Sequence, residues 1–375
     1  MRKIQMVDLI TQYELIKNEI DAAIQECLES ASFVKGKQVT QFQEALQRYL
    51  GVNNVIGCAN GTDALQIALM ALDLKPGDEV IVPAFTYVAT AEVIGLLGLT
   101  PVMVDVDKDT FNITPAIVEN AITSKTKLIV PVHLFGQCAD MEKILKIATD
   151  ANSYVIEDNA QSIGADYTCL DGSTHKSGTM GHIGTMSFFP SKNLGCFGDG
   201  GAVCTNDEYL ANRMRMIANH GQAKQYFHEI IGINSRLDAI QANILNVKLK
   251  YLQKYNKARQ HAANQYDKAF SGIASIQIPS RLPQSTHVFH QYTIKVPANQ
   301  RNQLKEYLAH QGIPSMIYYP LPLHRQKAFE NMGRTVGDLP VATELCTQVI
   351  SLPIHTEMDE EQQNFIINAV VSFFS

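Results

Sequence analysis

The sequence predicts an α/β fold with a large domain, built on a mainly parallel mixed sheet covered on both faces, and a smaller C-terminal α+β domain. Up to about residue 205, short apolar runs alternate with segments of helical spacing, a pattern typical of parallel strands joined by helices. After about residue 245 the chain reads as a long helix, a loop marked by prolines, a strand and another helix. We therefore expect the large domain, with its N-terminal helix, over residues 1–245 and the small domain over 246–375.

The individual elements follow from hydrophobic spacing and from turn residues. Helical spacing predicts helices over 9–30 and 39–50, around 65–72, 88–96 and 144–148, and one that Pro115 opens at its first turn. Short apolar runs predict strands at 55–56, 79–82, 101–105, 128–132 and 154–158. In the small domain we expect a helix over 247–270, a strand over 292–296 and a helix near Leu304.

Composition excludes several classes of function. A chain of 375 residues with 46% hydrophobic and 18% charged residues is typical of a globular protein with a sizeable core. The net charge of -6, without a dense Lys/Arg run, argues against nucleic acid as a partner. No apolar stretch approaches the roughly 20 residues of a membrane helix, and the N-terminus has no secretory apolar core. We expect neither a membrane nor a nucleic-acid partner.

The cysteines and histidines do not suggest a structural or metal site. The seven cysteines are scattered without a Cys-x-x-Cys pair, which argues against a disulfide scaffold and fits reduced thiols in the cytoplasm. His287 and His290 are three apart but stand in a polar segment without helical pattern, so no metal site is expected.

Lys192 is the residue with the most informative surroundings. The apolar run Ser187–Pro190 leads into it, and a glycine-rich turn follows. A lysine at the end of a buried strand is costly unless it has a use. Imine chemistry is such a use, because a desolvated amine has a lowered pKa and becomes a nucleophile.

Three further polar clusters follow strands, at Asn60–Thr62, Pro83–Tyr87 and Asp158–Gln161. Ligands gather at the carboxyl ends of parallel strands, so we expect these clusters and Lys192 at one edge of the sheet. Each cluster also has a purely structural interpretation: a turn with a helix cap, an aromatic ring in the core, and an aspartate that caps the next helix. The chain lacks a Walker loop and a Gly-x-Gly-x-x-Gly after its first strand, so neither of those phosphate motifs is expected.

Taken together, the clusters predict one cofactor. The free amides of the helix start at Gly61 and Thr62 would bind a phosphate, with the Ser187 hydroxyl as a second donor. Asp158 would pair with a cationic ring nitrogen, and Tyr87 would stack on an aromatic ring. A lysine, an aspartate, an aromatic ring and a phosphate cup are what pyridoxal 5'-phosphate (PLP) requires.

These motifs resemble the nucleotide-sugar aminotransferases of the DegT/DnrJ/EryC1/StrS family. The resemblance runs from about residue 5 to the C-terminus, and its matching runs are Asn60–Leu65, Pro83–Thr90, Glu157–Gln161, Ser187–Lys192 and Gly232–Asp238. It implies the fold-type I architecture of PLP-dependent aminotransferases and a homodimer with active sites at the subunit interface.

The resemblance also implies a role for each matching residue. Lys192 resembles the lysine that binds the cofactor and then moves the proton, and Asp158 resembles the partner of the pyridine nitrogen. Gln161 is similar to the residue beside the ring hydroxyl, and Tyr87 takes the stacking position. The residues implied at the phosphate are Gly61, Thr62, Ser187 and, from the neighbouring subunit, Asn234. Those implied near the sugar are Arg236, Tyr319 and His324, although Arg236 is equally interpreted as part of a salt bridge at the dimer surface.

The implied reaction is a ping-pong transfer of an amino group from L-glutamate to a nucleotide-diphosphate keto-sugar, in the synthesis of amino sugars for surface polysaccharide. The runs Gly232–Asp238 and Tyr318–His324 look most like those of the 3-keto-sugar enzymes. Both UDP-linked uronates and dTDP-linked 6-deoxy sugars occur among their substrates, and Arg236 would suit a uronate carboxylate.

Other interpretations stay open. Family members that dehydrate sugars replace the lysine with histidine, so the intact Lys192 favours transamination. A non-catalytic regulatory or binding protein with the same fold is one alternative, and an aminotransferase for a 4-keto-sugar or a cyclitol is another. The segment 168–182 departs from the family pattern by its length, and it is either a surface elaboration or a contact at the substrate entrance.

Overall fold

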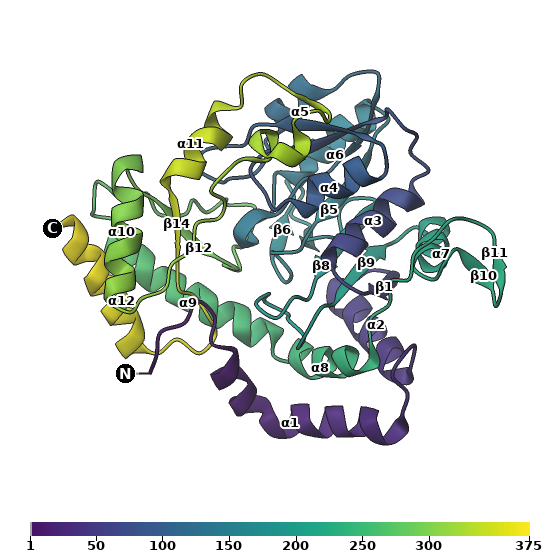
Figure 1. Ribbon diagram of the computed structural model, residues 1–375, viewed down its shortest axis with the longest axis horizontal. Coiled ribbons are helices and arrows are strands. Elements are labelled where there is room, and N and C mark those ends of the chain that lie inside the picture. The colour runs from purple at the N-terminus through teal and green to yellow at the C-terminus, as the bar shows by residue number, and fades with distance from the viewer. Residues whose placement is uncertain (1) are drawn as a thin grey trace.

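A computed structural model describes residues 2–375 and is built around an eight-stranded sheet (Figure 1). The strand order is β1-β9-β8-β5-β4-β2-β3-β13. The pairs from β8 to β13 are parallel, whereas β9 runs antiparallel to both β1 and β8. The strands are β1 Asn54–Cys58, β2 Glu79–Pro83, β3 Thr100–Val104, β4 Thr126–Ile129, β5 Tyr154–Asp158, β8 Ile183–Ser187, β9 Gly201–Thr205 and β13 Arg334–Thr335. The predicted α/β class with a mainly parallel mixed sheet is confirmed.

Helices cover the sheet in two groups. α3 packs with α4 and α7, and α5 packs with α6. Every residue of β2 and β9 is buried, so both faces of the sheet are covered at these strands. The helices from the start of the chain to the one that follows β9 are α1 Leu9–Ser30, α2 Lys37–Leu50, α3 Gly61–Ala71, α4 Ala89–Leu96, α5 Pro115–Ala121, α6 Met141–Asp150 and α7 Glu208–Ile217.

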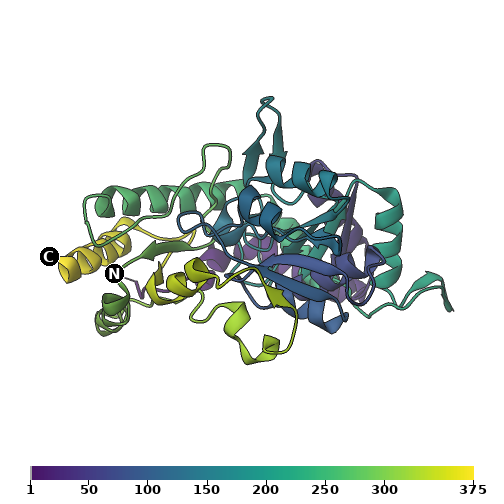
Figure 2. The ribbon, with the colours of Figure 1, turned by 90° about the horizontal axis from the view of Figure 1, so that it is seen from above.

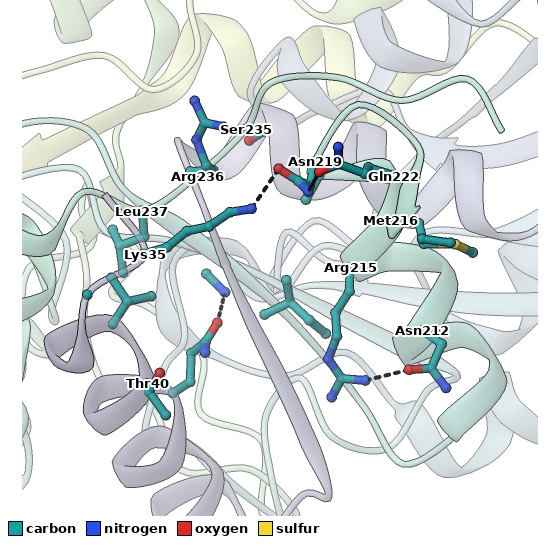
Figure 3. Close-up of a pocket in the computed structure, with 17 residues that line it drawn as sticks. Lys35, Thr40, Asn212, Arg215, Met216, Asn219, Gln222, Ser235, Arg236 and Leu237 are labelled. Atoms are coloured by element: carbon teal, nitrogen blue, oxygen red, sulfur yellow. Dashed lines mark hydrogen bonds between the residues drawn. The ribbon is translucent and has the colours of Figure 1, made fainter. Parts of the chain in front are cut away.

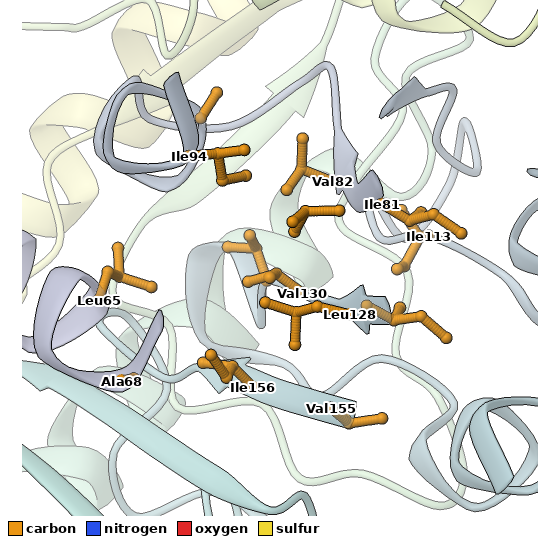
Figure 4. Packing of buried hydrophobic residues seen from close by; sticks show 14 of the residues in the cluster. Leu65, Ala68, Ile81, Val82, Ile94, Ile113, Leu128, Val130, Val155 and Ile156 are labelled. Atoms are coloured by element: carbon orange, nitrogen blue, oxygen red, sulfur yellow. The ribbon is translucent and has the colours of Figure 1, made fainter. Parts of the chain in front are cut away.

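The main hydrophobic core lies between the sheet and the helices α3 to α7 (Figure 4). Val82, Val130 and Ile156 lie side by side on one face of the sheet, and Leu65 and Ile94 close this layer from α3 and α4, whereas Ile81 points to the other face, toward Ile113. Burial of such side chains contributes about 1.5–3 kcal/mol each. The core therefore holds the carboxyl ends of β2, β5 and β8 in fixed positions.

A second hydrophobic core lies in the C-terminal part of the chain. It joins a two-stranded antiparallel sheet to three helices, with Tyr266, Tyr292 and Leu304 at its centre. Its elements are α9 Leu252–Phe270, β12 Tyr292–Lys295, α10 Ala298–His310, β14 Val349–Leu352 and α12 Glu360–Phe374, and α11 Pro340–Gln348 lies between the two parts. The N-terminus and the C-terminus lie at this end of the molecule (Figure 1).

The expected single helix over 247–270 is wrong. Two helices occupy this stretch, α8 Ala239–Leu249 and α9, and they are separated at Lys250 and Tyr251. α8 packs against α1 and α2, whereas α9 turns toward the second core to bury Tyr266 and Phe270 there. Helical spacing continues through both helices, so it gave no sign of the change in direction.

Two short hairpins extend from this body. β6 Asp166–Thr168 pairs with β7 Thr174–Lys176, and β10 Gln222–Lys224 pairs with β11 Phe227–His228. Figure 2 shows both projecting away from the packed elements. Within residues 2–375, no helix combines the length and the apolar character that crossing a membrane requires.

Candidate active site

The predicted site residues gather where parallel strands end. Asp158 is the last residue of β5, Ser187 is the last residue of β8, and Pro83–Tyr87 leaves β2. β5 and β8 are neighbours, and β2 lies beyond β4 on the other side of β5. The sheet therefore brings these groups to one edge, as expected for an open α/β sheet.

Asp158 is fixed by a hydrogen bond on each carboxylate oxygen. Thr90 Oγ1 donates to its Oδ2 across 2.8 Å, and the Ala160 amide donates to its Oδ1 across 3.2 Å. The residue is 5% exposed. A buried carboxylate needs such donors, and the two that are present leave further acceptor positions on the group.

Lys192 lies in the turn after β8, where its backbone amide donates to the carbonyl of Phe189 across 2.8 Å. Burial lowers the pKa of Lys192 to about 8, and the charge of Asp158 opposes that effect. The neighbouring Asn193 is held by α9, because its side-chain amide donates to Asn256 Oδ1 across 2.7 Å. The site thus contains an amine that loses its proton at a lower pH than an ordinary lysine does, on a turn with a fixed backbone.

The start of α3 and the end of β8 form a tight cradle. A Cβ on Gly61 would lie 2.6 Å from the Ser187 Cβ, so only glycine allows this approach. Asn60 is the N-cap of α3, and its Oδ1 accepts the Asp63 amide across 2.8 Å. In the structural interpretation of this cluster the helix cap is thus Asn60, and Thr62 lies inside the first turn. Free amides at the N-terminus of this 11-residue helix are suited to a phosphate.

Gln161, Tyr319 and Tyr87 form a wall beside Asp158. Gln161 Nε2 donates to the Tyr319 phenol across 3.2 Å, and the Tyr319 and Tyr87 rings lie 6.4 Å apart. Burial raises the pKa of Tyr319, which keeps its phenol protonated. Tyr87 is 57% exposed, so its ring does not pack in the core and is free to stack on a ligand.

His324 lies shortly after Tyr319 in the chain and has unused hydrogen-bonding capacity. Both of its ring nitrogens are buried without a partner among residues 2–375, and burial lowers its pKa. The adjacent Leu323 amide donates to the Ala84 carbonyl across 2.8 Å, which holds this turn against the end of β2. Buried unpaired nitrogens carry a free-energy cost, which a polar ligand at this position would remove.

Asn234 and Arg236 flank Ser235, whose hydroxyl accepts the Ala59 amide across 3.0 Å just before the start of α3. No hydrogen bond within the described part of the chain joins either of them to the other predicted site residues. Arg236 lines a cavity of about 620 Å³, together with Lys35 and Arg215, and no acidic residue is among the lining residues. Figure 3 shows the Lys35 amine directed at the Asn219 side chain. The backbone of Asn219 forms an isolated antiparallel β-bridge with that of Asn234.

Two functional contacts were missed from the sequence. Thr90 stands in the Pro83–Thr90 run but was not connected with Asp158, because the contact depends on the order of the strands. Glu157 is fully buried and accepts from His133 Nε2 across 2.7 Å. It also accepts three backbone amides, those of Gly178, Met180 and Gly181. An acidic residue in an otherwise apolar strand was the available signal for it.

These contacts divide the segment 168–182 into an inner and an outer part. Its inner part is held by the residues on either side of Asp158, since Glu157 binds residues 178–181 and the Asn159 side chain donates to the Ser177 carbonyl across 2.9 Å. Its outer part is the β6–β7 hairpin, where Leu170 is 87% exposed. The outer part is thus a surface elaboration on a base beside the site.

Comparison with known proteins identifies the family. The DegT/DnrJ/EryC1/StrS aminotransferase family matches residues 14–371. The chain is 44% identical over 375 residues to a "Pleiotropic regulatory protein" of Geobacillus stearothermophilus, covering 99% of this chain and 98% of the relative. It is 43% identical over 369 residues to the "UDP-2-acetamido-2-deoxy-3-oxo-D-glucuronate aminotransferase" of Pseudomonas aeruginosa, covering 98% and 100%.

A solved structure gives the same result for the fold. NtdA from Bacillus subtilis, with bound cofactor PMP, superposes with a TM-score of 0.88 at 33% identity, covering 98% of this chain and 83% of that one. The family match spans nearly the whole chain and includes every strand end described above. The chain therefore belongs to the DegT/DnrJ/EryC1/StrS aminotransferase family.

Proposed function

We propose that the protein is a PLP-dependent aminotransferase that moves an amino group from L-glutamate to C3 of a nucleotide-diphosphate keto-sugar. The observation that carries this proposal is that Lys192, whose pKa burial lowers to about 8, stands within the electrostatic influence of the buried Asp158 carboxylate, after the ends of the neighbouring strands β5 and β8. A neutral amine and a buried carboxylate are the two groups that PLP chemistry requires from a protein.

The residues present fit the cofactor. Gly61, Thr62 and Ser187 would hold its phosphate, because the free amides at the start of α3 and the Ser187 hydroxyl are hydrogen-bond donors. The close approach of α3 to β8, which leaves no room for a side chain at Gly61, brings these donors together. Asp158 would hold the ring nitrogen, Gln161 would lie beside the ring hydroxyl, and Tyr87 would cover the ring. When bound, PLP supplies an electron sink for the bonds at the substrate's amino-bearing carbon.

The chain's own groups then do the proton chemistry. The neutral Lys192 amine would take the α-proton of L-glutamate, and the ammonium so formed would give that proton to the cofactor carbon that carries the transferred nitrogen. A base with a pKa near the working pH suits both steps. Tyr319 and Gln161 keep the wall of the site in place, and the unpaired His324 nitrogens are available to a sugar hydroxyl.

We further propose that the active protein is a homodimer in which Asn234 and Arg236 complete the site of the partner subunit. Neither residue forms a hydrogen bond to the other predicted site residues within residues 2–375, which supports this proposal. So does the apolar surface nearby, where Tyr226, Phe227 and Ile231 are 80%, 64% and 85% exposed. Exposed apolar groups in such a cluster are typical of an interface.

The name of the Pseudomonas relative supports a 3-oxo sugar as acceptor. Arg236 would pair with a uronate carboxylate, for which a guanidinium offers two parallel hydrogen bonds. On this ground we propose a UDP-linked uronate ahead of a dTDP-linked 6-deoxy sugar as the acceptor. We also propose that the protein acts in the cytoplasm and that its product is used in the synthesis of surface polysaccharide. The division into domains at 1–245 and 246–375 is likewise our proposal, supported by the second core, which α9, β12, α10, β14 and α12 form in the C-terminal part of the chain.

The acceptor is tested by turnover of matched nucleotide sugars with the ketone at C3 or at C4. We expect faster turnover of the 3-keto compound, and a preference for the 4-keto compound or for a cyclitol would reject the assignment. Arg236→Gln should raise the KM for a UDP-3-keto-uronate and leave the KM for a 6-deoxy 3-keto-sugar nearly unchanged. An equal rise for both sugars would mean that Arg236 does not read the carboxylate.

A second candidate function is a regulatory protein that binds cofactor or sugar without turnover, which the name of the Geobacillus relative favours. The visible spectrum of the purified protein with PLP separates the two functions. For an aminotransferase we expect a yellow band that bleaches when L-glutamate is added and that does not form in Lys192→Ala. A protein that stays colourless, or a band that glutamate does not change, would favour the regulatory function.

A further inference from the structure

Thr90 reaches a residue that lies two strands away in the sheet. It belongs to the first turn of α4, which follows β2, whereas Asp158 ends β5, and β4 lies between these strands. The Thr90 Oγ1 to Asp158 Oδ2 distance is 2.8 Å. The two residues are 1% and 5% exposed, so water does not compete for this contact. A hydroxyl bound to a buried carboxylate is among the stronger hydrogen bonds in proteins.

The two oxygens of Asp158 are held from different directions. Thr90 binds Oδ2, and the Ala160 amide binds Oδ1 at the longer distance of 3.2 Å. The Ala160 donor lies two residues along the same chain segment, so Thr90 is the donor that comes from another element. Two such donors set the plane of a carboxylate and still leave acceptor positions free.

We infer that Thr90 is a positioning residue of the transamination reaction, whose hydroxyl orients the Asp158 carboxylate toward the ring nitrogen of the cofactor. This inference rests on the proposed function. It adds a residue of α4 to the predicted site residues. Positioning of this kind matters because small displacements of a charged group cost catalysis steeply.

A role in packing alone is the competing explanation. α4 is already secured without the hydroxyl, since Ala91, Val93 and Ile94 are each at most 1% exposed and belong to the main core. A packing role would depend on the Thr90 methyl group, whereas a positioning role depends on the Thr90 hydroxyl. Two substitutions therefore separate them, because Thr90→Val keeps the branched shape and Thr90→Ser keeps the hydroxyl.

The test measures the glutamate half-reaction of the PLP-loaded protein by stopped-flow absorbance, together with the rate at which each variant loses PLP on dilution. For Thr90→Val we expect a fall of about tenfold in kcat, a change below twofold in the KM for glutamate, and faster loss of PLP. Thr90→Ser should stay within about threefold of the wild type. In an Asp158→Asn background, Thr90→Val should add little, since the group that it positions is already altered.

Thr205→Val is the matched control. Thr205 is also a buried threonine, and its hydroxyl donates to the His182 carbonyl across 2.7 Å at the other end of the sheet. We expect a lower unfolding midpoint for this variant with an unchanged kcat. If Thr90→Val does not fold, Thr90→Ala compared with Thr90→Ser gives the same contrast.

Three results would overturn the inference: wild-type kinetics in Thr90→Val, a loss in Thr90→Ser as large as in Thr90→Val, or an equal loss of kcat in Thr205→Val. A wild-type protein that neither binds PLP nor reacts with glutamate would overturn the proposed function as well. A wild-type protein that does both, beside an unaffected Thr90→Val, would overturn the Thr90 role alone.

Discussion

The side-chain amide of Gln161 donates to the phenol of Tyr319 across 3.2 Å, and this contact joins segments that lie 158 residues apart in the sequence. The same amide group accepts the backbone amide of Phe135 across 2.7 Å through its Oε1. Gln161 therefore connects the turn after β4, the end of β5 and the loop that carries His324.

Replacement of Tyr319 by phenylalanine should destabilise the protein by about 1 kcal/mol, the usual net contribution of one hydrogen bond. The Phe135 contact of Gln161 should persist, so the loss should not be larger. Urea unfolding measures the change. Tyr307→Phe is the control, because the Tyr307 phenol makes no hydrogen bond within residues 2–375 and its ring packs on Phe373. An equal change in both variants would contradict a specific role for the Tyr319 phenol.

Gly61→Ala should weaken binding of PLP more than it weakens the fold. The added Cβ would lie 2.6 Å from the Ser187 Cβ, so the start of α3 must move away from β8. We expect a fall of at least tenfold in PLP affinity, measured by fluorescence titration. Gly272→Ala is the control, because a Cβ there meets nothing within 4 Å. Unchanged PLP affinity in Gly61→Ala would show that the phosphate does not bind at this cradle.

The reaction of the cofactor-free protein with PLP should depend on the pH near neutrality. Below a pKa of about 8 the Lys192 amine is protonated and unreactive, and above that pKa it is neutral. The rate should therefore rise with pH and level off above about pH 8, whereas an ordinary lysine would continue to gain up to pH 10.4 or so. Stopped-flow absorbance measures the rate.

Lys248 needs a control in this experiment, because burial also lowers its pKa to about 8. It is 1% exposed on α8 and lies under the Phe197 ring, with the amine 5.4 Å from the ring centre. Lys192→Ala should abolish the pH-dependent signal, and Lys248→Met should retain it. A rate that keeps rising beyond pH 10 in the wild type would contradict the lowered pKa of Lys192.

Glu157→Leu should be among the most destabilising single substitutions, with a loss of about 4 kcal/mol or more. It would leave the buried Gly178 amide, the partly buried Met180 and Gly181 amides and the buried His133 ring without their acceptor, at about 1–3 kcal/mol for each buried unsatisfied group. Denaturant unfolding of the cofactor-free protein measures this loss. Glu344→Leu on α11 is the control, because Glu344 is exposed and accepts one side-chain bond from Gln348, and its change should stay within about 0.5 kcal/mol. A small loss for Glu157→Leu would mean that water replaces the carboxylate.

The sequence predicts the groups that stand at strand ends but not the contacts between elements. Asp158 ends an apolar run that was recognised as a strand, and it is the last residue of β5. The run Ser187–Pro190 before Lys192 is not a strand, because β8 ends at Ser187 and Lys192 lies in the turn that follows. The Thr90 contact to Asp158 depends on the order β5-β4-β2, which local patterns do not contain.

Helix ends show the same limit at a smaller scale. Both Asn60 and Thr62 have side chains that cap helices, and only the backbone conformation shows that Asn60 has this position. The break between α8 and α9 was hidden because both helices keep the same apolar period while facing different cores.

The β6–β7 hairpin combines a free tip with a fixed base. At the tip, Asp171 and Gly172 form an exposed turn, and a Cβ on Gly172 would meet nothing within 4 Å. At the base, Ser177 and the Gly178–Gly181 turn are bound to Glu157 and Asn159. Extra residues inserted at the tip, such as a fluorescent-label sequence, would extend into solvent, whereas a deletion of one residue at the base would pull on both neighbours of Asp158. The hairpin is therefore a place where related chains can differ in length without a change in chemistry, and where this protein can be tagged.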